Sequence, residues 1–279
     1  MTQREILQPY IDATGKAMRE VEGDYYQDNI LYCGKCNTPK QITVTIDDVE
    51  TTVPCLCDCG VVQRDKEIAE FNERKRRAEI NALRISGIHD KSIRGMTFDT
   101  DDGSNPDATN KAKRYVAKWD KMRHDNIGLL LWGNTGNGKT FIAACIANAL
   151  IDRNVPVLMT SFPQILSGLT GLFGDDRVAY IRSLINFPLL IIDDLGAERD
   201  SEFSREQIYA VIDARYKQRL PLIITTNLTL DELKKPKDIE CRRIYDRILE
   251  MCVPIYFSGD SRRKVTAAEK MKLAKAMFE

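Results

Sequence analysis

Short apolar runs alternate with helical patterns through the second half of the chain. The runs read GLLLWG, VPVLMTS, PLLIIDD, LPLIITTN and CVPIYF, and each has the length of a buried strand. Between them, apolar residues recur with helical spacing near 139–151, 161–185, 203–218 and 229–250. Strands that alternate with helices are typical of a mostly parallel sheet covered on both faces. The pattern therefore predicts an α/β fold for this half of the chain.

The first half follows a different pattern. The segment QITVTIDDVETTVP alternates apolar and polar residues around a central Asp pair, which predicts a short β-hairpin. Residues 61–85 are charged and helix-prone; they predict a solvated helix, with a basic nucleic-acid contact at 74–77 as the alternative. The polar, turn-rich residues 100–110 predict a linker, and one helix from 111 to 123 is expected to follow it.

Composition excludes several classes of protein. Of the 279 residues, 43% are hydrophobic, which is enough for a sizeable core and excludes wholesale disorder. Forty-one Lys and Arg balance forty-one Asp and Glu, so net charge gives no argument for binding to nucleic acid. The longest apolar runs, such as 187–192, are far shorter than the roughly 18 residues that span a bilayer. The start, MTQREILQPY, lacks the apolar core of a signal peptide. We expect a cytoplasmic protein with no membrane partner.

A glycine-rich segment follows the first apolar run. Residues 133–140, GNTGNGKT, match G-x-x-x-x-G-K-[ST] between a strand-like run and a helical pattern, which is the context that this phosphate-binding motif requires. The glycines let backbone N–H groups converge on phosphate oxygens at a helix N-terminus. Lys139 is expected to reach the β- and γ-phosphates, and Thr140 to bind Mg²⁺. The motif therefore predicts binding of ATP or GTP.

Two later strands end in polar residues that suit a nucleotide site. The run LLIIDD ends in Asp193, expected to hold Mg²⁺ through water, and Asp194, expected to polarise the attacking water. Many ATPases of this kind carry Glu at the second position, so the shorter Asp194 is expected to slow hydrolysis; its alternative role is to begin the next turn. The run LIITTN ends in Asn227, a candidate to orient water or sense the γ-phosphate. The candidate cofactor-binding residues are Gly133, Asn134, Thr135, Gly136, Asn137, Gly138, Lys139, Thr140 and Asp193.

Five of the eight cysteines lie between Cys33 and Cys59. Clustered cysteines in a cytosolic protein bind metal more often than they form disulfides. Two thiolate pairs brought together by the hairpin give the tetrahedral sulfur set that a structural zinc ion prefers. The predicted Zn²⁺ ligands are Cys33, Cys36, Cys57 and Cys59, with Cys55 as an alternative to either of the last two. Reduced thiols without metal are the alternative for the whole cluster.

The motifs of the second half together resemble the AAA+ ATPases. They are most similar to the DnaC-type helicase loaders of bacteria and phages, which share a superfamily with the IstB-type transposition helpers. The resemblance is carried by GNTGNGKT, LLIIDDLGAERDS, LIITTNLTLDEL, RRIYDRILE and GDSRRK, within residues 127–265. It implies a P-loop AAA+ core with a parallel sheet and a reduced lid. The cysteine cluster resembles the N-terminal zinc module of some Gram-positive loaders.

The resemblance also implies catalytic arginines. Subunits of this family assemble into a ring or spiral in which an arginine of one subunit completes the ATP site of its neighbour. By resemblance, this arginine corresponds to Arg247, with Arg243 as the second candidate. The family's second sensor arginine corresponds to Arg263, although the adjacent Arg262 could occupy the same position. A guanidinium suits the role because its planar donors match phosphate oxygens. The alternative for each is an ordinary surface cation.

Family members insert helical structure that faces the channel of the ring between their second and third strands. By resemblance, Phe173, Ser201 and Phe203 are candidates to contact single-stranded DNA, because a phenylalanine can stack on a base without sequence preference. The helical spacing of Phe162 and Phe173 is also typical of a core face, which is the alternative for Phe173.

These features divide the chain into an N-terminal region with a zinc-binding module (1–63), a charged helix with a linker (64–110) and an AAA+ ATPase domain (111–279). The expected function is ATP-dependent loading of the replicative DNA helicase onto single-stranded DNA, with ATP, Mg²⁺ and Zn²⁺ as cofactors and self-association into an ATP-bridged oligomer. The alternatives are an IstB-type transposition helper, a small-metabolite kinase, and a nucleotide-gated DNA-binding switch with little turnover. The identity of the helicase and the size of the oligomer stay open.

Overall fold

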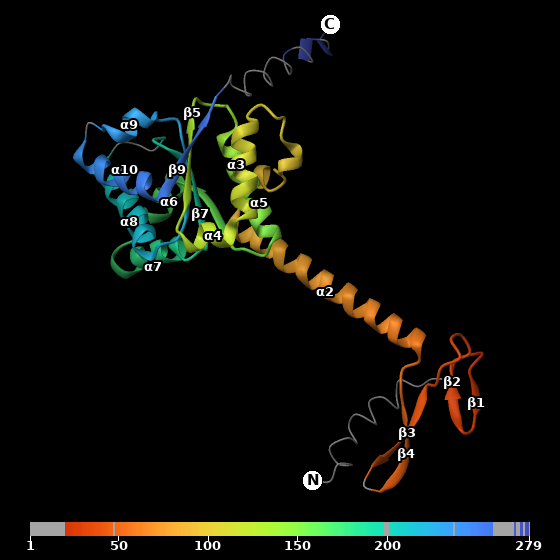
Figure 1. Cartoon of the computed structure of the whole chain (residues 1–279). Coiled ribbons are helices and arrows are strands. Elements are labelled where there is room, and N and C mark those ends of the chain that lie inside the picture. The colour runs from red at the N-terminus through yellow and green to blue at the C-terminus, as the bar shows by residue number, and fades with distance from the viewer. Residues whose placement is uncertain are drawn as a thin grey trace. The chain divides into compact units, whose positions relative to one another are not determined.

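The chain forms two compact units, which Figure 1 shows together with their helices and strands. The structure is a computed structural model that describes residues 20–46, 48–197, 201–236, 238–258, 271, 274–275 and 277–278. One unit comprises residues up to Arg77 and the other begins at Ala78, so the boundary lies inside helix α2 (Asp58–Gly87). Within these described segments, no helix combines the length and the apolar character needed to cross a membrane.

The first unit contains two β-hairpins and the beginning of α2 (Figure 1). The second hairpin confirms the predicted one, with Gln41 opposite Pro54 at its open end. The first hairpin was not predicted, although its turn has a clear signal. Asp28 and Asn29 have φ angles of 49° and 62°, and Asp and Asn are among the residues that adopt this left-handed conformation in tight hairpin turns. The strands are β1 (Tyr25–Gln27), β2 (Ile30–Tyr32), β3 (Gln41–Ile46) and β4 (Val49–Pro54).

Helix α2 contains the predicted charged helix and extends it at both ends. Its surface is mostly polar, and charges of opposite sign pair along it. The Glu73 carboxylate lies 3.0 Å from Arg76 and 2.7 Å from Arg77, at the i,i+3 and i,i+4 spacings that stabilise a helix. These pairs along a polar surface agree with a solvated helix; the alternative, a basic nucleic-acid contact at 74–77, is not tested by them.

The second unit is built around a five-stranded parallel sheet with strand order β6-β7-β8-β5-β9. All five predicted apolar runs form its strands, so the predicted α/β fold is confirmed. The strands are β5 (Gly128–Gly133), β6 (Val157–Ser161), β7 (Leu189–Leu195), β8 (Leu222–Thr226) and β9 (Cys252–Phe257).

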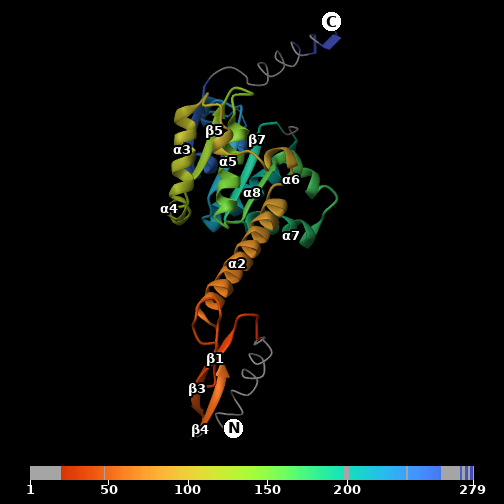
Figure 2. The ribbon, with the colours of Figure 1, turned by 90° about the vertical axis from the view of Figure 1, so that its right-hand side faces the viewer.

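Helices cover both faces of this sheet, because each strand sends alternate side chains to opposite sides. On β5, Leu129 and Leu131 belong to the core beneath α3, α4 and α5, whereas Leu130 belongs to the core beneath α6 to α10. Figures 1 and 2 show α3 and α5 on one side of the sheet and α8 on the other. The helices here are α3 (Pro106–Ala117), α4 (Trp119–His124), α5 (Lys139–Asp152) and α8 (Glu202–Gln218).

Three predicted helices are each broken in two. The single helix expected at 111–123 forms α3 and α4, separated at Lys118, and α3 already begins at Pro106, inside the residues predicted to be a linker. The pattern at 161–185 forms α6 (Phe162–Leu169) and α7 (Gly174–Ile185), because Gly171 and Gly174 turn the chain with φ angles of 83° and 53°. The pattern at 229–250 forms α9 (Leu230–Lys234) and α10 (Ile239–Met251), with Pro236 between them. Short 3-10 turns, η1 (Lys91–Ile93) and η2 (Phe98–Thr100), precede α3.

The strand order determines where a ligand can bind. Strand β5 lies between β8 and β9, so the chain leaves β5 toward one edge of the sheet and later returns to its other side. Ligands of open parallel sheets bind beyond the carboxyl ends of the strands at such a point of reversal. The glycine-rich segment follows β5 at this point, and Asn227 follows the neighbouring strand β8.

Candidate nucleotide and metal sites

The glycine-rich loop has a backbone that only glycine adopts readily. Gly133, Gly136 and Gly138 have φ angles of 138°, 86° and 97°. Gly133 also passes close to β9, where an added Cβ atom would lie 2.4 Å from the carbonyl oxygen of Phe257. Gly138 ends the loop as the N-cap of α5. The loop thereby presents backbone N–H groups at a helix N-terminus, which is the arrangement that binds phosphate.

Lys139 lies at the centre of this loop and is only 5% exposed. Its ammonium donates to the carbonyl oxygens of Gly133 and Asn134, both at 2.7 Å, and to the side-chain oxygen of Asn227 at 2.9 Å. A buried ammonium requires such acceptors because it has lost its water. The contacts hold a positive charge inside the loop and connect it to the end of β8.

Asp193 lies next to the loop, where two threonine hydroxyls contact its carboxylate. The Thr140 hydroxyl is 2.9 and 3.1 Å from the two carboxylate oxygens, and the Thr225 hydroxyl donates to one of them at 2.6 Å. Burial raises the pKa of Asp193 above its usual range, the Thr225 hydroxyl opposes this shift, and the nearby Asp194 adds to it. A divalent cation beside the carboxylate would favour its ionised form, so this pair of oxygen groups fits Mg²⁺.

A cavity of about 550 Å³ connects these groups. The structure brings the predicted site residues together around this cavity: Lys139, Thr140, Asp193, Asp194 and Asn227 all line it. Four further lining residues come from the segment before α3, within the region 64–110 that the sequence predicts to be a charged helix and a linker. The lining residues are Asp90, Ser92, Ile93, Met96, Thr135, Gly136, Gly138, Lys139, Thr140, Phe141, Asp193, Asp194 and Asn227.

The segment that contains Ile93 and Met96 is fixed to the phosphate-loop helix by Asn148 of α5. This amide is 1% exposed, and its nitrogen donates to the carbonyl oxygens of Ile93 at 2.9 Å and Met96 at 3.0 Å. Its oxygen accepts from Arg84 at 3.1 Å. Sequence reasoning missed this wall, since the only local signal is an apolar pair, Ile93 and Met96, between polar residues. It adds two apolar side chains, Ile93 and Met96, to the lining of the cavity.

The predicted catalytic arginines lie outside this cavity or outside the described residues. Arg247 of α10 packs against α8, where its guanidinium is 2.7 Å from the Asp213 carboxylate and 4.5 Å above the ring of Tyr209. Arg243, one turn earlier, is exposed and lines a separate pocket with Glu240. Arg263 and its neighbour Arg262 fall among the residues that the structure does not describe.

The three candidate DNA-contacting residues have different environments. Phe173 is 77% exposed, whereas Phe162 is fully buried, so the core-face alternative does not hold for Phe173. Phe203 is 37% exposed, and the guanidinium of Arg177 lies 5.9 Å from the ring of Phe173 and 5.4 Å from that of Phe203. Ser201 caps α8 by accepting a hydrogen bond from a backbone N–H at 3.1 Å. The two exposed rings and the cation form a surface able to stack on bases.

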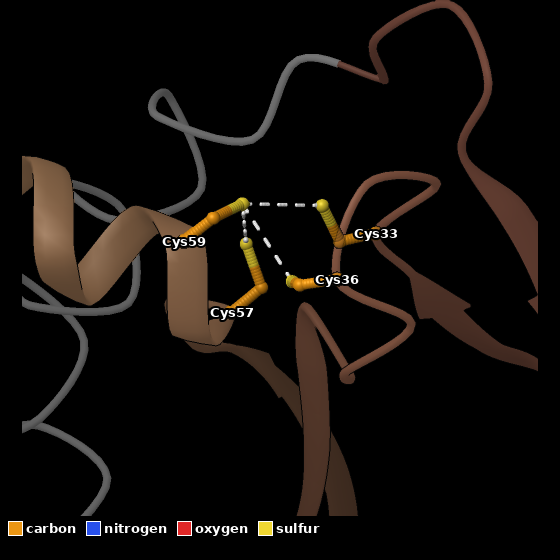
Figure 3. A group of neighbouring side chains, drawn as sticks. All are labelled: Cys33, Cys36, Cys57 and Cys59. Carbon is orange, nitrogen blue, oxygen red and sulfur yellow. Dashed lines mark hydrogen bonds between the residues drawn. The ribbon is translucent and has the colours of Figure 1, made fainter.

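In the first unit, four cysteine sulfurs converge (Figure 3). The Sγ atom of Cys59 lies 3.5 Å from that of Cys33, 3.6 Å from Cys36 and 3.4 Å from Cys57, and all four lie within 4.8 Å of one another. A zinc–sulfur bond of about 2.3 Å in a tetrahedron implies sulfurs about 3.8 Å apart. The cluster therefore fits a structural zinc ion, and it contains the four cysteines named from the sequence.

Cys55 lies outside this cluster. Its thiol donates instead to the carbonyl oxygen of Pro39 at 3.4 Å, and burial raises its pKa. Backbone N–H groups of Cys36 and Lys35 lower the pKa of Cys33, and the Thr38 hydroxyl lowers that of Cys36 to about 5. The alternative in which Cys55 replaces Cys57 or Cys59 is disfavoured by position, because the Cys55 sulfur lies outside the group of converging sulfurs.

Comparison with known proteins supports the reading of the motifs. A family model described as IstB-like ATP binding protein matches residues 61–270. The replicative helicase loader DnaI of Bacillus subtilis (strain 168) is 30% identical over 147 residues, which are 49% of this chain and 47% of that protein. The replicative helicase loader DnaC of Escherichia coli (strain K12) is 30% identical over 168 residues, which are 58% of this chain and 66% of that protein. The matches therefore span less than two thirds of these relatives.

Solved structures agree with these matches. The crystal structure of DnaI covers 62% of this chain and 96% of its own length, with a TM-score of 0.53 and 26% identity. The crystal structure of the DnaC helicase loader covers 61% of this chain with a TM-score of 0.51 and 23% identity, and it supports the fold alone. The resemblance to the loaders that the motifs indicate is confirmed.

Proposed function

Because the chain belongs to the IstB-like ATP binding protein family, we propose that it is an ATP-dependent loader of the replicative DNA helicase onto single-stranded DNA. The observation that carries the proposal is the cavity at the carboxyl ends of the strands, where a buried ammonium, a hydroxyl and two carboxylates meet. Such a set of groups suits a triphosphate with its magnesium ion. The similarity to two helicase loaders supports the choice of this role, which we place in the cytoplasm.

In the proposed reaction the phosphate loop and Lys139 bind the triphosphate. Thr140 and Asp193 would hold Mg²⁺, which would supply positive charge to the phosphate oxygens. Asp194 accepts the proton of the attacking water, and Asn227 orients that water or the γ-phosphate. Asn227 already contacts Lys139 through its side-chain oxygen, which supports its place beside the phosphates.

We further propose that Arg247 completes the ATP site of a neighbouring subunit in an ATP-bridged oligomer, with Arg243 as the second candidate and Arg263 as a second sensor. Arg247 lies on α10 and does not line the cavity of its own chain, as a residue that acts in a neighbour requires. Its pairing with Asp213 and Tyr209 keeps the guanidinium in one orientation on the surface of α8 and α10.

A mixing experiment tests this assignment. A Lys139→Ala subunit supplies Arg247 but no working phosphate loop, and an Arg247→Ala subunit supplies the converse. Each alone is expected to be inactive, and a mixture is expected to recover part of the ATPase rate, because one of its interfaces then combines both intact groups. The absence of recovery in a mixture that still assembles would exclude Arg247.

We propose that the zinc module contacts the helicase and that Phe173, Phe203 and Ser201 contact single-stranded DNA. The four convergent sulfurs support a stable, metal-supported module, and the exposed rings beside Arg177 support base stacking. The oligomer would thus hold the helicase at its N-terminal modules while DNA binds along the ATPase domains.

The full loader proposal is tested by mixing the chain with a candidate replicative helicase, with and without ATP, and measuring the mass of any complex and the transfer of helicase to single-stranded DNA. A complex that forms with the wild type and loads DNA only with ATP supports the role. The Lys139→Ala variant should lose loading, whereas Lys121→Ala, which removes an exposed lysine of α4, should not. No association under either condition would exclude the loader function.

Two other functions remain in competition. The family description names IstB, so the second candidate is an IstB-type transposition helper, which would act on duplex DNA. Stimulation of ATP hydrolysis by duplex but not single-stranded DNA would support it. A nucleotide-gated switch with little turnover would bind ATP but show equal, near-zero rates in wild type, Asp194→Ala and Arg247→Ala.

A further inference from the structure

The two consecutive carboxylates of the nucleotide cavity lie opposite a single residue of the neighbouring strand. The register of β7 against β8 shifts between Ile192 and Leu195, so that Asp193 and Asp194 both lie opposite Thr225. Two residues facing one define a β-bulge, which bends the strand and re-aims its side chains. The bulge brings both carboxylates to the cavity, where regular alternation would send them to opposite faces of the sheet.

The side chain of Thr225 contacts both bulged residues. Its hydroxyl donates to the Asp193 carboxylate at 2.6 Å and accepts from the backbone N–H of Asp194 at 2.9 Å. One hydroxyl can make both bonds, because it carries one proton and two lone pairs. Thr225 is fully buried, so no water competes for either bond.

The bulge needs this support. Asp194 has a φ of 57°, a left-handed conformation that costs energy for any residue with a side chain, and a bulge removes ladder hydrogen bonds from its extra residue. The hydroxyl of Thr225 replaces the missing partner of the Asp194 N–H. The neighbouring Thr226 has a different partner: its hydroxyl donates to the carbonyl oxygen of Leu195 at 2.8 Å and not to either carboxylate.

We propose that Thr225 is a positioning residue of the ATPase, whose hydroxyl fixes the metal-binding carboxylate of Asp193 and the backbone turn of Asp194 at the same time. The inference rests on the proposed function and deepens it. The hydroxyl of Thr140 also contacts Asp193, but it is assigned to bind Mg²⁺. The hydroxyl of Thr225 is assigned only to holding Asp193 and Asp194 in place. Through its hydroxyl, Thr225 therefore connects strand β8, which Asn227 follows, to both acidic residues.

The test compares two substitutions in the full-length chain. Thr225→Val keeps the branched shape and removes the hydroxyl, whereas Thr225→Ser keeps the hydroxyl. For Thr225→Val, kcat should fall roughly tenfold to hundredfold with little change in the KM for ATP, because the groups are misplaced but the phosphate loop is intact. Mn²⁺ affinity, measured with a non-hydrolysable ATP analogue, should fall as well. Thr225→Ser should restore both quantities.

A second measurement needs neither nucleotide nor metal. Hydrogen exchange at the Asp194 amide reports directly on its bond to Thr225, because an amide without a partner exchanges faster. Exchange should accelerate in Thr225→Val and stay near the wild-type rate in Thr225→Ser. Thr160→Val is the matched control: Thr160 is a buried threonine of β6 in the same sheet, and its hydroxyl contacts Gln164 away from the cavity.

The outcomes separate the two proposals. Wild-type kcat, Mn²⁺ affinity and exchange in Thr225→Val would overturn the positioning role, and so would a Thr225→Ser variant as impaired as Thr225→Val, since shape and not the hydroxyl would then matter. A wild-type chain that hydrolyses no ATP would refute the ATPase. The positioning role would still stand on the Mn²⁺ and exchange effects.

Discussion

At several positions of the nucleotide site, the backbone conformation limits which residue types can occur, in addition to the chemistry that the site requires. Gly133 and Gly138 have positive φ angles that residues with side chains rarely adopt, and Asp194 has a left-handed φ of 57°. Among residues with side chains, Asp and Asn adopt the left-handed region most readily. This restriction gives a physical reason for Asp at a position where many similar ATPases carry Glu. Local geometry disfavours a longer side chain there.

Substituting Asp194 separates its backbone from its charge. Asp194→Asn keeps the tolerance for the left-handed turn and removes the general base, so ATP affinity should be retained while hydrolysis falls about 10²- to 10⁴-fold. Phosphate release and nucleotide titration measure the two effects. Asp194→Glu should instead lower stability by about 1 kcal/mol, because the left-handed turn is strained. An Asp194→Asn variant that hydrolyses ATP at the wild-type rate would contradict the assigned role.

Elements around the site act through side chains that fix one element to another. Asn148 of α5 holds the segment with Ile93 and Met96, and the glycine-broken turn between α6 and α7 exposes Phe173. The first feature joins segments that are distant in sequence, and the second depends on how a turn is oriented. One substitution tests each of them.

Asn148→Ala should weaken nucleotide binding without abolishing hydrolysis. The carbonyl oxygens of Ile93 and Met96 lose their donor, so the free energy of unfolding should fall by about 1 to 3 kcal/mol and the cavity wall should loosen. Chemical denaturation and titration with a fluorescent ATP analogue measure these changes. Asn110→Ala on the exposed face of α3 is the control. Equal nucleotide affinities in the two variants would show that the wall is not part of the site.

Phe173→Ala tests the proposed DNA contact. Loss of one stacking ring should weaken binding of single-stranded DNA by about 1 to 3 kcal/mol at fixed salt, because base stacking on an aromatic ring contributes that much. Stability should not change, since the ring is exposed. Phe71→Ala removes another exposed ring, one on α2 that is 61% exposed, and serves as the control. Fluorescence anisotropy with a labelled oligonucleotide would reveal equal affinities if Phe173 does not touch DNA.

At the scale of the whole molecule, the two units have different sources of stability. The second has a sheet with a core on each face. The first has two short hairpins, and its buried apolar residues in the described part are few: Leu31, Cys33 and Cys57. A unit this small needs a metal or disulfides to be stable, and the cysteine cluster is itself a large part of its core.

Removal of zinc should therefore unfold one unit and spare the other. With a strong chelator, hydrogen exchange should become fast in the two hairpins, while nucleotide binding at Lys139 persists. Cys57→Ser should have the same effect and abolish the roughly one equivalent of bound zinc expected for a four-sulfur site. Cys55→Ser should retain it, because its sulfur lies outside the cluster. Zinc that remains in Cys57→Ser but is lost from Cys55→Ser would reverse the ligand assignment.

The sequence by itself determined the five strands of the parallel sheet, the positions of most helices and the phosphate loop. Strand runs, the period of the helices and the loop's glycines and lysine are local patterns, and local sterics and hydrogen bonding suffice to interpret them. The hairpin of β3 and β4 and the candidate zinc ligands were also predicted from local patterns, namely the alternation of apolar residues and the spacing of cysteines. The first hairpin was within reach too, through the Asp28-Asn29 turn.

Only the tertiary structure decided which distant side chains meet. The bulge opposite Thr225, the wall held by Asn148 and the exclusion of Cys55 from the sulfur cluster depend on pairing between strands or on packing between elements. A hydrogen bond between residues 31 positions apart, such as that from the Asp194 N–H to Thr225, leaves no periodic trace along the chain. Its energy is gained only after the fold has brought both partners together, which is why composition and spacing do not predict it.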